Sequence, residues 1–409
     1  MAKGKQKPLD DDYETPRFSS TAGARGHNHW KLKLLAVLTV LVASLVALAP
    51  TIVFDTPLGE HLLASATGNL NGTLKLREIS FGWITPLEIV DAELCDEKGN
   101  VVVKVPRVAG TKSLLGLVGW PLDFGEIRIE SPHADIELRD GGSNVEDVLA
   151  NYLTGPSQPS QLTVGGTVAV TDAVVVVHDI AAQKSWNIQP LAASAKLPIT
   201  PNQTIELSAE GAIVDAEKRP APFSLKLQSD RLVLKTQDFP LAITQALARR
   251  AVAGAQLDGR LQTDVSCQWQ QHDGKLRRTL DGRLAIDGLA AACGVSGSEQ
   301  LRLASLVVPC HIAWEGDKLC IDQLELNCDV GKITCQGTIG DPLHAFEAGA
   351  MNGLASIVAG GNAQLTAQLD LAKVAQLLPN TLHIRSGGIV RSGAVNLQLS
   401  TQANGTGAV

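Results

Sequence analysis

The sequence predicts a mainly β protein, with an N-terminal transmembrane helix followed by an elongated, curled antiparallel β-groove, taco-like in section, and a few short helices. Three observations predict this fold class. Residues 34–54 form an uncharged apolar run, the chain after residue 160 alternates apolar and polar side chains, and aromatic residues make up only 4% of the chain. An apolar run of about 20 residues matches the bilayer core. Alternation with period 2 gives strands with one apolar and one polar face.

The apolar run is expected to be an uncleaved, single-pass anchor in the inner (cytoplasmic) membrane. Basic residues precede the run and acidic residues follow it, which places the N-terminus in the cytoplasm and the bulk of the chain in the periplasm. A cleaved signal peptide is the alternative. It is disfavoured because Pro50 would follow the small residues of the cleavage site and because the run is longer than a signal core. The expected anchor residues are Leu34, Leu38, Leu41, Leu45, Leu48 and Phe54.

Composition excludes several classes of function. The net charge is −7 and no basic stripe occurs outside the anchor flanks, which argues against nucleic-acid binding. Seven cysteines at irregular spacing, without a CxxC pair, predict neither a disulfide framework nor a zinc ribbon. Cys267, Cys310 and Cys335 alternate with apolar residues and are expected to pack as small hydrophobes. A disulfide between Cys328 and Cys335 across a hairpin stays open.

Four segments are expected along the chain: a disordered cytoplasmic tail over residues 1–30, the anchor over 31–54, a membrane-proximal α+β start of the groove over 55–155, and a repeating β-groove over 156–409. Within the third segment, Ser131 and Pro132 separate two strands, and Asn144 is expected to cap a short helix that ends at Tyr152. Residues 155–160 read as a linker. Two helices interrupt the later strands, over residues 240–252 and 371–378.

A five-residue word with a central glycine recurs in the β-rich part, at Gly211, Gly259, Gly282, Gly337 and Gly393. Glycine inside a strand is typical of a bulge or a bend, so the word favours hairpins that each bend at a glycine. Chance recurrence in a glycine-rich chain is the alternative, because the spacing is not constant.

Counting one-sided strands gives roughly 18 from Leu70 onward, which would make a body about 85 Å long at about 4.8 Å per strand. The apolar positions hold mostly Val, Leu, Ile, Cys and Ala, which favours an open trough over a closed, self-filled core. Lipid acyl chains are the expected ligand of such a trough at a membrane. The candidate groove residues are Val168, Val170, Leu225, Leu227, Val265, Cys267, Trp269, Leu284, Ile286, Val308, Ile312, Trp314, Leu324, Leu326, Val395 and Leu397.

The chain resembles an AsmA/TamB-type protein of the repeating β-groove superfamily, which includes the chorein-type bridge-like lipid transfer proteins. The resemblance is carried by residues 56–59 after the anchor, by 82–87, and furthest by 125–144, which resembles that family's strand–Pro–strand hairpin leading into "Gly, x, Asn" and a short helix. The glycine words and residues 387–399 look like later groove repeats. The resemblance implies an inner-membrane protein that projects into the periplasm and serves phospholipid transport or outer-membrane assembly.

No catalytic motif, metal-ligand pattern or cofactor-binding motif occurs in the sequence, so a non-enzymatic protein without cofactor is expected. His311 follows Cys310 directly, and neighbours in a strand point to opposite faces, so the two do not form a metal pair. Two alternatives to a lipid conduit remain. One is a structural or assembly factor that binds outer-membrane or periplasmic proteins, and the other is an enzyme on a parallel β-helix, which the uneven turn lengths disfavour.

Overall fold

The computed structural model describes residues 67–118, 122–154, 164–198, 204–215, 217–272, 275–292, 300–316, 318–340, 361–380, 382–384 and 388–400. The expected cytoplasmic tail, the anchor at 34–54 and the linker at 155–160 lie outside the described residues.

The described part is mainly β, as the sequence predicts, and the number of strands agrees with the expected 18. The strands are β1 Gly72–Ser80, β2 Glu88–Asp96, β3 Val101–Gly110, β4 Leu122–Glu130, β5 His133–Arg139, β6 Gly142–Ser143, β7 Val164–Asp179, β8 Lys184–Leu197, β9 Glu206–Val214, β10 Pro220–Leu227, β11 Arg231–Pro240, β12 Gln256–His272, β13 Lys275–Ala292, β14 Gln300–Glu315, β15 Lys318–Cys328, β16 Gly331–Gly340, β17 Asn362–Asp370 and β18 Ala394–Ser400. The helices are α3 Leu114–Leu117, α4 Asn144–Val148, α5 Ala150–Thr154, η1 Leu241–Thr244, α6 Gln245–Ala251 and α9 Leu371–Leu377.

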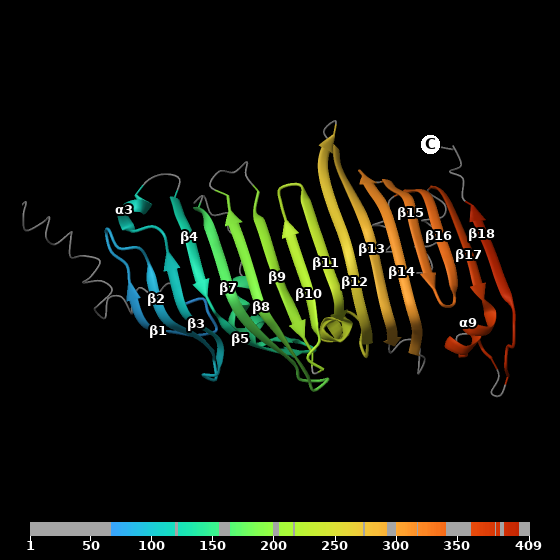
Figure 1. The fold of residues 1–409 in the computed structure, drawn as a ribbon, viewed down its shortest axis with the longest axis horizontal. Helices are drawn as coiled ribbons and strands as arrows, with labels where there is room; N and C mark the ends of the chain where they lie inside the picture. Colours follow the sequence, from blue (N-terminus) through green and yellow to red (C-terminus); the bar gives the residue numbers. More distant parts are fainter. Residues whose placement is uncertain are drawn as a thin grey trace, which may run out of the picture. The chain divides into compact units, whose positions relative to one another are not determined.

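The strands form one sheet in which neighbours in sequence are almost always neighbours in space (Figure 1). From β7 to β18 each strand pairs antiparallel with the next, and β1, β2 and β3 do the same. The exception lies between β5 and β7, because β7 runs parallel to both β4 and β5. The expected all-antiparallel sheet is therefore wrong at this point, and the sheet is mixed.

The two strands around Pro132 do not form a hairpin, which corrects the expected strand–Pro–strand hairpin. β4 and β5 both pair antiparallel with β3 on one side and parallel with β7 on the other, so they form one interrupted strand. Ser131 has φ 48°, and its N–H donates to Thr171 O at 2.8 Å. Val174 N–H donates to Pro132 O at 2.9 Å, so β7 bridges the break. Proline has no N–H to give to the ladder, which is why the strand is interrupted there.

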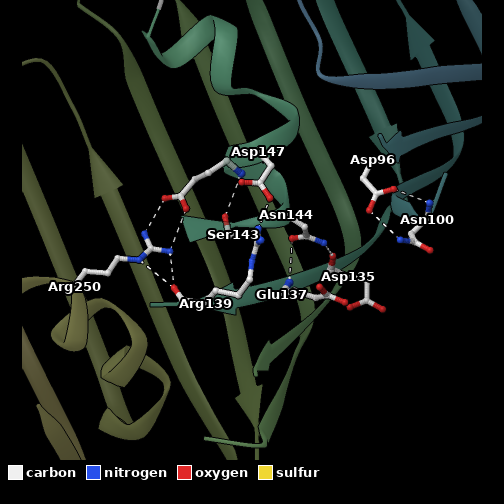
Figure 2. A network of polar contacts seen from close by, with 10 residues as sticks. Asp96, Asn100, Asp135, Glu137, Arg139, Ser143, Asn144, Asp147 and Arg250 are labelled. Carbon is white, nitrogen blue, oxygen red and sulfur yellow. Dashed lines mark hydrogen bonds and ion pairs between the residues drawn. The ribbon is translucent and has the colours of Figure 1, made fainter. Parts of the chain in front are cut away.

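The connection from β5 to β7 explains the parallel pairing, since parallel strands need a crossover of a dozen or more residues. It contains β6, α4 and α5. Ser143 caps α4, because its side chain accepts a hydrogen bond from Glu146 N. The expected cap, Asn144, binds the neighbouring strand instead, since its Nδ2 donates to Asp135 O at 2.8 Å and its Oδ1 accepts from Glu137 N at 3.0 Å. Asn144 thus holds the start of the helix against β5 (Figure 2).

The two helices predicted in the later part of the chain are confirmed, as η1 with α6 and as α9. Asp370 caps α9 by accepting hydrogen bonds from Ala372 N and Lys373 N. Both helical segments pack on the same face of the sheet. The first contributes Ala242 to a buried cluster with Val177, Trp186 and Ile213, and α9 packs its Val374 and Leu377 against a second cluster around Leu289 and Leu303.

Register shifts interrupt several strands next to these clusters. They occur between Val170 and Ala173 in β7, between Ile188 and Leu191 in β8, between Thr236 and Phe239 in β11, and between Asp258 and Arg260 in β12. Bulges bend a strand and raise its twist. The glycine word marks two of these shifts, at Gly211, which pairs with Leu191, and at Gly259, which has φ 134°. A shift also occurs at Gly337, between its partner Ile321 and Leu324 in β15, whereas at Gly282 the pairing continues without a shift, so the expected bend at every glycine is wrong there.

Candidate functional site: a continuous apolar face

One row of residues crosses the sheet from β1 to β18 without a polar side chain. Each member lies directly opposite the next across the strand pairing, so all members share one face. In order, this apolar row consists of Ile79, Ile89, Val108, Ile129, Val170, Ala193, Ala209, Leu225, Leu234, Val265, Gly282, Cys310, Leu324, Cys335, Leu365 and Leu399.

A second row runs beside the apolar row and is also apolar. It passes from Val168 on β7 through Leu227 and Cys267 to Ile312 on β14. The register places all the candidate groove residues named above on this same face. Ile79, Ile89 and Val108, which begin the row, are not among these candidates.

The apolar face is only half covered. None of the candidate groove residues is buried, and Leu326, Val395 and Leu397 are 36%, 39% and 44% exposed. The buried clusters under η1 and α9 lie beyond the bulges, toward one end of the strands. The side chains therefore do not close over into a dry, self-filled core along the two rows.

The opposite face is polar and is laced by ion pairs between neighbouring strands. Their nitrogen–oxygen distances are 2.8 Å for Lys104–Glu93, 2.9 Å for Arg107–Glu88, 2.8 Å for Lys226–Glu210, 3.1 Å for Lys235–Asp264 and 2.9 Å for Lys332–Glu325. The hydrogen bond from Lys104 lowers the pKa of Glu93, and the one from Lys332 lowers the pKa of Glu325. Water-facing charges and half-exposed apolar side chains are thus sorted onto opposite faces of the same strands.

A polar depression of about 380 Å³ lies on this opposite face rather than on the apolar one. Its lining includes Ser224, Lys235, Gln262 and Arg283, from four neighbouring strands. Its polar lining does not favour the binding of apolar ligands, so the depression and the apolar face are separate features.

At one edge of the apolar face, called the rim below, an arginine lies between two tryptophans on neighbouring strands. Arg278 on β13 lies directly opposite Trp269 on β12 and opposite Trp314 on β14. Trp269 Nε1 donates to Ser229 O at 2.8 Å, which fixes that indole. The candidate residues include the two tryptophans but not Arg278, because only the pairing of β13 with both neighbouring strands brings the three together.

Arg249 and Arg250 of α6 form ion pairs with Asp140, Asp179 and Glu146, and these five residues, called the latch below, hold the helix to the strands. Arg249 donates to Asp179, which is 1% exposed, and to Asp140 at 2.6 Å. The hydrogen bond to Asp140 is the largest cause that raises the pKa of Arg249. Arg250 Nη1 donates to Glu146 Oε1 at 2.9 Å, and Figure 2 shows its guanidinium between α4 and the backbone of Arg139. These contacts bring together residues 70 to 111 positions apart in the sequence.

Neighbouring strand residues point to opposite faces at Cys310 and His311, as expected. Cys310 is buried on the apolar face, whereas His311 contacts Asp281 and, at 3.3 Å, Asp322 on the polar face. Within the residues that the structure describes, no group of three His, Cys, Asp or Glu side chains could hold a metal ion.

The open alternative of a Cys328–Cys335 disulfide is wrong. Both thiols are free, and the register sets Cys328 opposite Gly331 and Cys335 opposite Leu324. Burial raises the pKa of the Cys310 and Cys335 thiols, as is typical of cysteines that pack as hydrophobes.

Comparison with known proteins gives no relative: no family model, curated protein or solved structure matches the chain. Among the described residues, no helix has the length and apolar character needed to cross a bilayer.

Proposed function

We propose that this protein carries phospholipid acyl chains along its apolar face, as a non-enzymatic conduit between the membranes of a cell envelope. The single observation that supports the proposal most is the apolar row, which passes through every strand from β1 to β4 and from β7 to β18 without a polar side chain. In this proposal residues 34–54 anchor the chain in the inner membrane and the sheet lies in the periplasm. The likeness to AsmA/TamB-type proteins belongs to the same proposal.

The physical reason is the incomplete cover of the apolar face. Fully burying one Leu or Val side chain is worth about 1.5–3 kcal/mol, so a partly exposed row forgoes a part of that stabilisation at most of its strands. An acyl chain supplies the missing cover without needing directional contacts. Because the row has no polar side chain to act as a barrier, a chain could move along it with little change in free energy.

The rim has side chains that could bind the phosphate headgroup of a phospholipid. An arginine binds phosphate oxygens through paired N–H donors, and indoles favour the boundary between apolar and wet surroundings. Arg278 between Trp269 and Trp314 therefore offers a headgroup position beside the apolar face.

The test is to purify the full chain in mild detergent, to identify bound lipid by mass spectrometry, and to measure transfer of labelled phospholipid between two vesicle populations. We expect co-purifying phospholipid and protein-dependent transfer. A chain that carries no lipid and does not speed transfer would overturn the proposal.

A second candidate function, an assembly factor for outer-membrane or periplasmic proteins, is favoured by β18. All seven of its residues are exposed, none is charged, and among the described residues it pairs with β17 alone. Natural sheet edges are usually protected by charges, prolines or bulges, and a bare edge can accept a strand from a partner. A stoichiometric protein partner that cross-links to Asn396 or Gln398, and that persists when Val265 is changed to Asp, would favour this function over lipid transport.

A further inference from the structure

An uncharged apolar tip protrudes at one end of β1–β4. It is built from the loop at residues 81–87, between β1 and β2, and from residues 113–118, which contain α3. Neither segment has a charged residue. Three of their large side chains are among the most exposed apolar ones in the described part of the chain: Ile84 is 83%, Leu115 56% and Val118 74% exposed.

Hydrogen bonds join the two segments into one body. Leu114 N donates to Gly82 O at 3.0 Å, and Leu115 N donates to Trp83 O at 3.1 Å. Within the first loop, Gly82 N donates to Thr85 O at 3.1 Å, which closes a turn under Ile84. Figure 1 shows α3 at the end of these first strands. The exposed side chains are therefore displayed by a fixed backbone.

The support of this tip is polar and lies behind it. Lys112, just before α3, pairs with Asp123 at 2.6 Å, and its ammonium also donates to Asp123 O at 3.0 Å. Thr111 N donates to Glu126 O at 2.9 Å and holds the segment to β4. The two charged residues that adjoin the tip in sequence are thus both paired, Lys112 with Asp123 and Glu88 with Arg107.

We propose that Ile84, Leu115 and Val118 insert into the interfacial layer of a lipid bilayer and so seat this end of the sheet on a membrane. Three large apolar side chains on one small, uncharged tip suit a fluid bilayer better than a protein partner, which would need a broad complementary surface. The absence of charge on both segments means that insertion leaves no charge to desolvate.

The inference deepens the proposed function and rests on it only for the anchor at residues 34–54. Residues 55–71, between that anchor and β1, span at most about 60 Å when extended. The first strands thus stay within reach of the bilayer. Insertion of the tip would bring Ile79 and Ile89, where the apolar row begins, next to the membrane that supplies the lipid.

The test is site-specific photo-cross-linking of the full chain in phosphatidylcholine vesicles. A benzophenone amino acid replaces Ile84 or Val118, and lipid adducts are measured by peptide mass. Ile389, 78% exposed near β18, is the control matched in exposure and apolar character, and Val101, 44% exposed at the other end of β3, is a second apolar control. We expect lipid adducts at Ile84 and Val118 in about tenfold excess over both controls, as the burial of one large side chain implies.

Two further variants separate this inference from the proposed function. With the cross-linker at Leu115, the double variant Ile84→Asp and Val118→Asp should lose most of the adduct, whereas Val265→Asp on the apolar row should keep it. Loss of the adduct in Val265→Asp would mean that groove-bound lipid, not the bilayer, is being labelled. Vesicle flotation reports the anchor separately. A protein that floats but gives no adduct at Ile84 or Val118, or gives adducts to protein there, would overturn the inference and leave the conduit standing.

Discussion

Arg249 donates two hydrogen bonds to the carboxylate of Asp179, 2.8 Å to Oδ1 and 3.0 Å to Oδ2. The arginine lies on α6 and the aspartate ends β7, seventy positions earlier in the chain. Because the Asp179 side chain is 1% exposed and the Arg249 side chain 12% exposed, this pair fixes η1 and α6 over one end of the apolar face while itself being nearly dry.

Arg249→Ala should lower the free energy of unfolding by about 3 kcal/mol, since it leaves the carboxylate of Asp179, 1% exposed, buried without its counterion. Urea unfolding followed by circular dichroism measures the change. Lys235→Ala is the matched control, because its pair with Asp264 is exposed on both sides and should contribute less than about 1 kcal/mol. An equal loss of unfolding free energy in the two variants would show that the buried ion pair contributes no more to stability than the exposed one.

Gly282→Ala should destabilise the protein by about 2 kcal/mol or more. Gly282 has φ 153°, and a Cβ atom there would come within 2.6 Å of Val265 Cα and 2.3 Å of Asp264 O, both backbone atoms of β12. Gly141→Ala is the control, because nothing lies within 4 Å of its Cβ position. Thermal unfolding of both variants compares them, and an unchanged midpoint for Gly282→Ala would contradict the close approach of β12 and β13.

Val265→Asp, Ile312→Asp and Leu326→Asp should each reduce lipid transfer, because each sets a charge on the apolar face, at a cost of several kcal/mol unless water enters. Transfer between vesicles is measured for each variant. Gln268→Asp is the control, since Gln268 lies on the polar face of the same strand as Val265, opposite Arg231. Normal transfer by all three apolar-face variants would exclude the rows as a conduit.

Arg278→Gln should weaken the binding of phospholipid about tenfold while leaving the binding of an uncharged acyl-chain probe unchanged, because a charge-assisted hydrogen bond is worth roughly 1.5–3 kcal/mol. Titration of the detergent-free protein with each lipid measures both affinities. Arg302→Gln serves as control, since Arg302 lies near the other end of the β13–β14 pairing, opposite Ala290. Equal loss for both ligands would mean that Arg278 has no part in headgroup binding.

The contribution of His311 to stability should fall as pH rises. The hydrogen bond to Asp281 raises the pKa of His311 above 6.5, helped by Asp281 and Asp322 charges and opposed by burial and by Arg277. A raised folded-state pKa gives stabilisation that is complete below the unfolded pKa of about 6.5 and is lost as pH passes through the folded value. Unfolding measured from mildly acidic to mildly alkaline pH tests this, and His311→Gln should remove that part of the slope. An identical slope in the variant would contradict the assignment.

The sequence predicted much of the strand and helix content because both depend on local patterns. Period-2 alternation in segments such as Leu225–Leu227 and Val265–Trp269 requires strands with one apolar face, whatever lies beside them. The helix predicted over residues 371–378, before Pro379, is likewise found as α9. Where Asn144 failed as the expected cap, its side chain binds the backbone of β5, a contact that no local pattern specifies.

The sequence by itself determined that each strand has an apolar and a polar face, because side-chain alternation is a property of the strand alone. Only the tertiary structure decided that these faces line up from Ile79 to Leu399, because register is set by pairing between strands and a slip of one residue would have reversed a face. The parallel pairing of β7 with β4 and β5, and the latch that joins Arg249 to Asp179, likewise depend on contacts between distant segments.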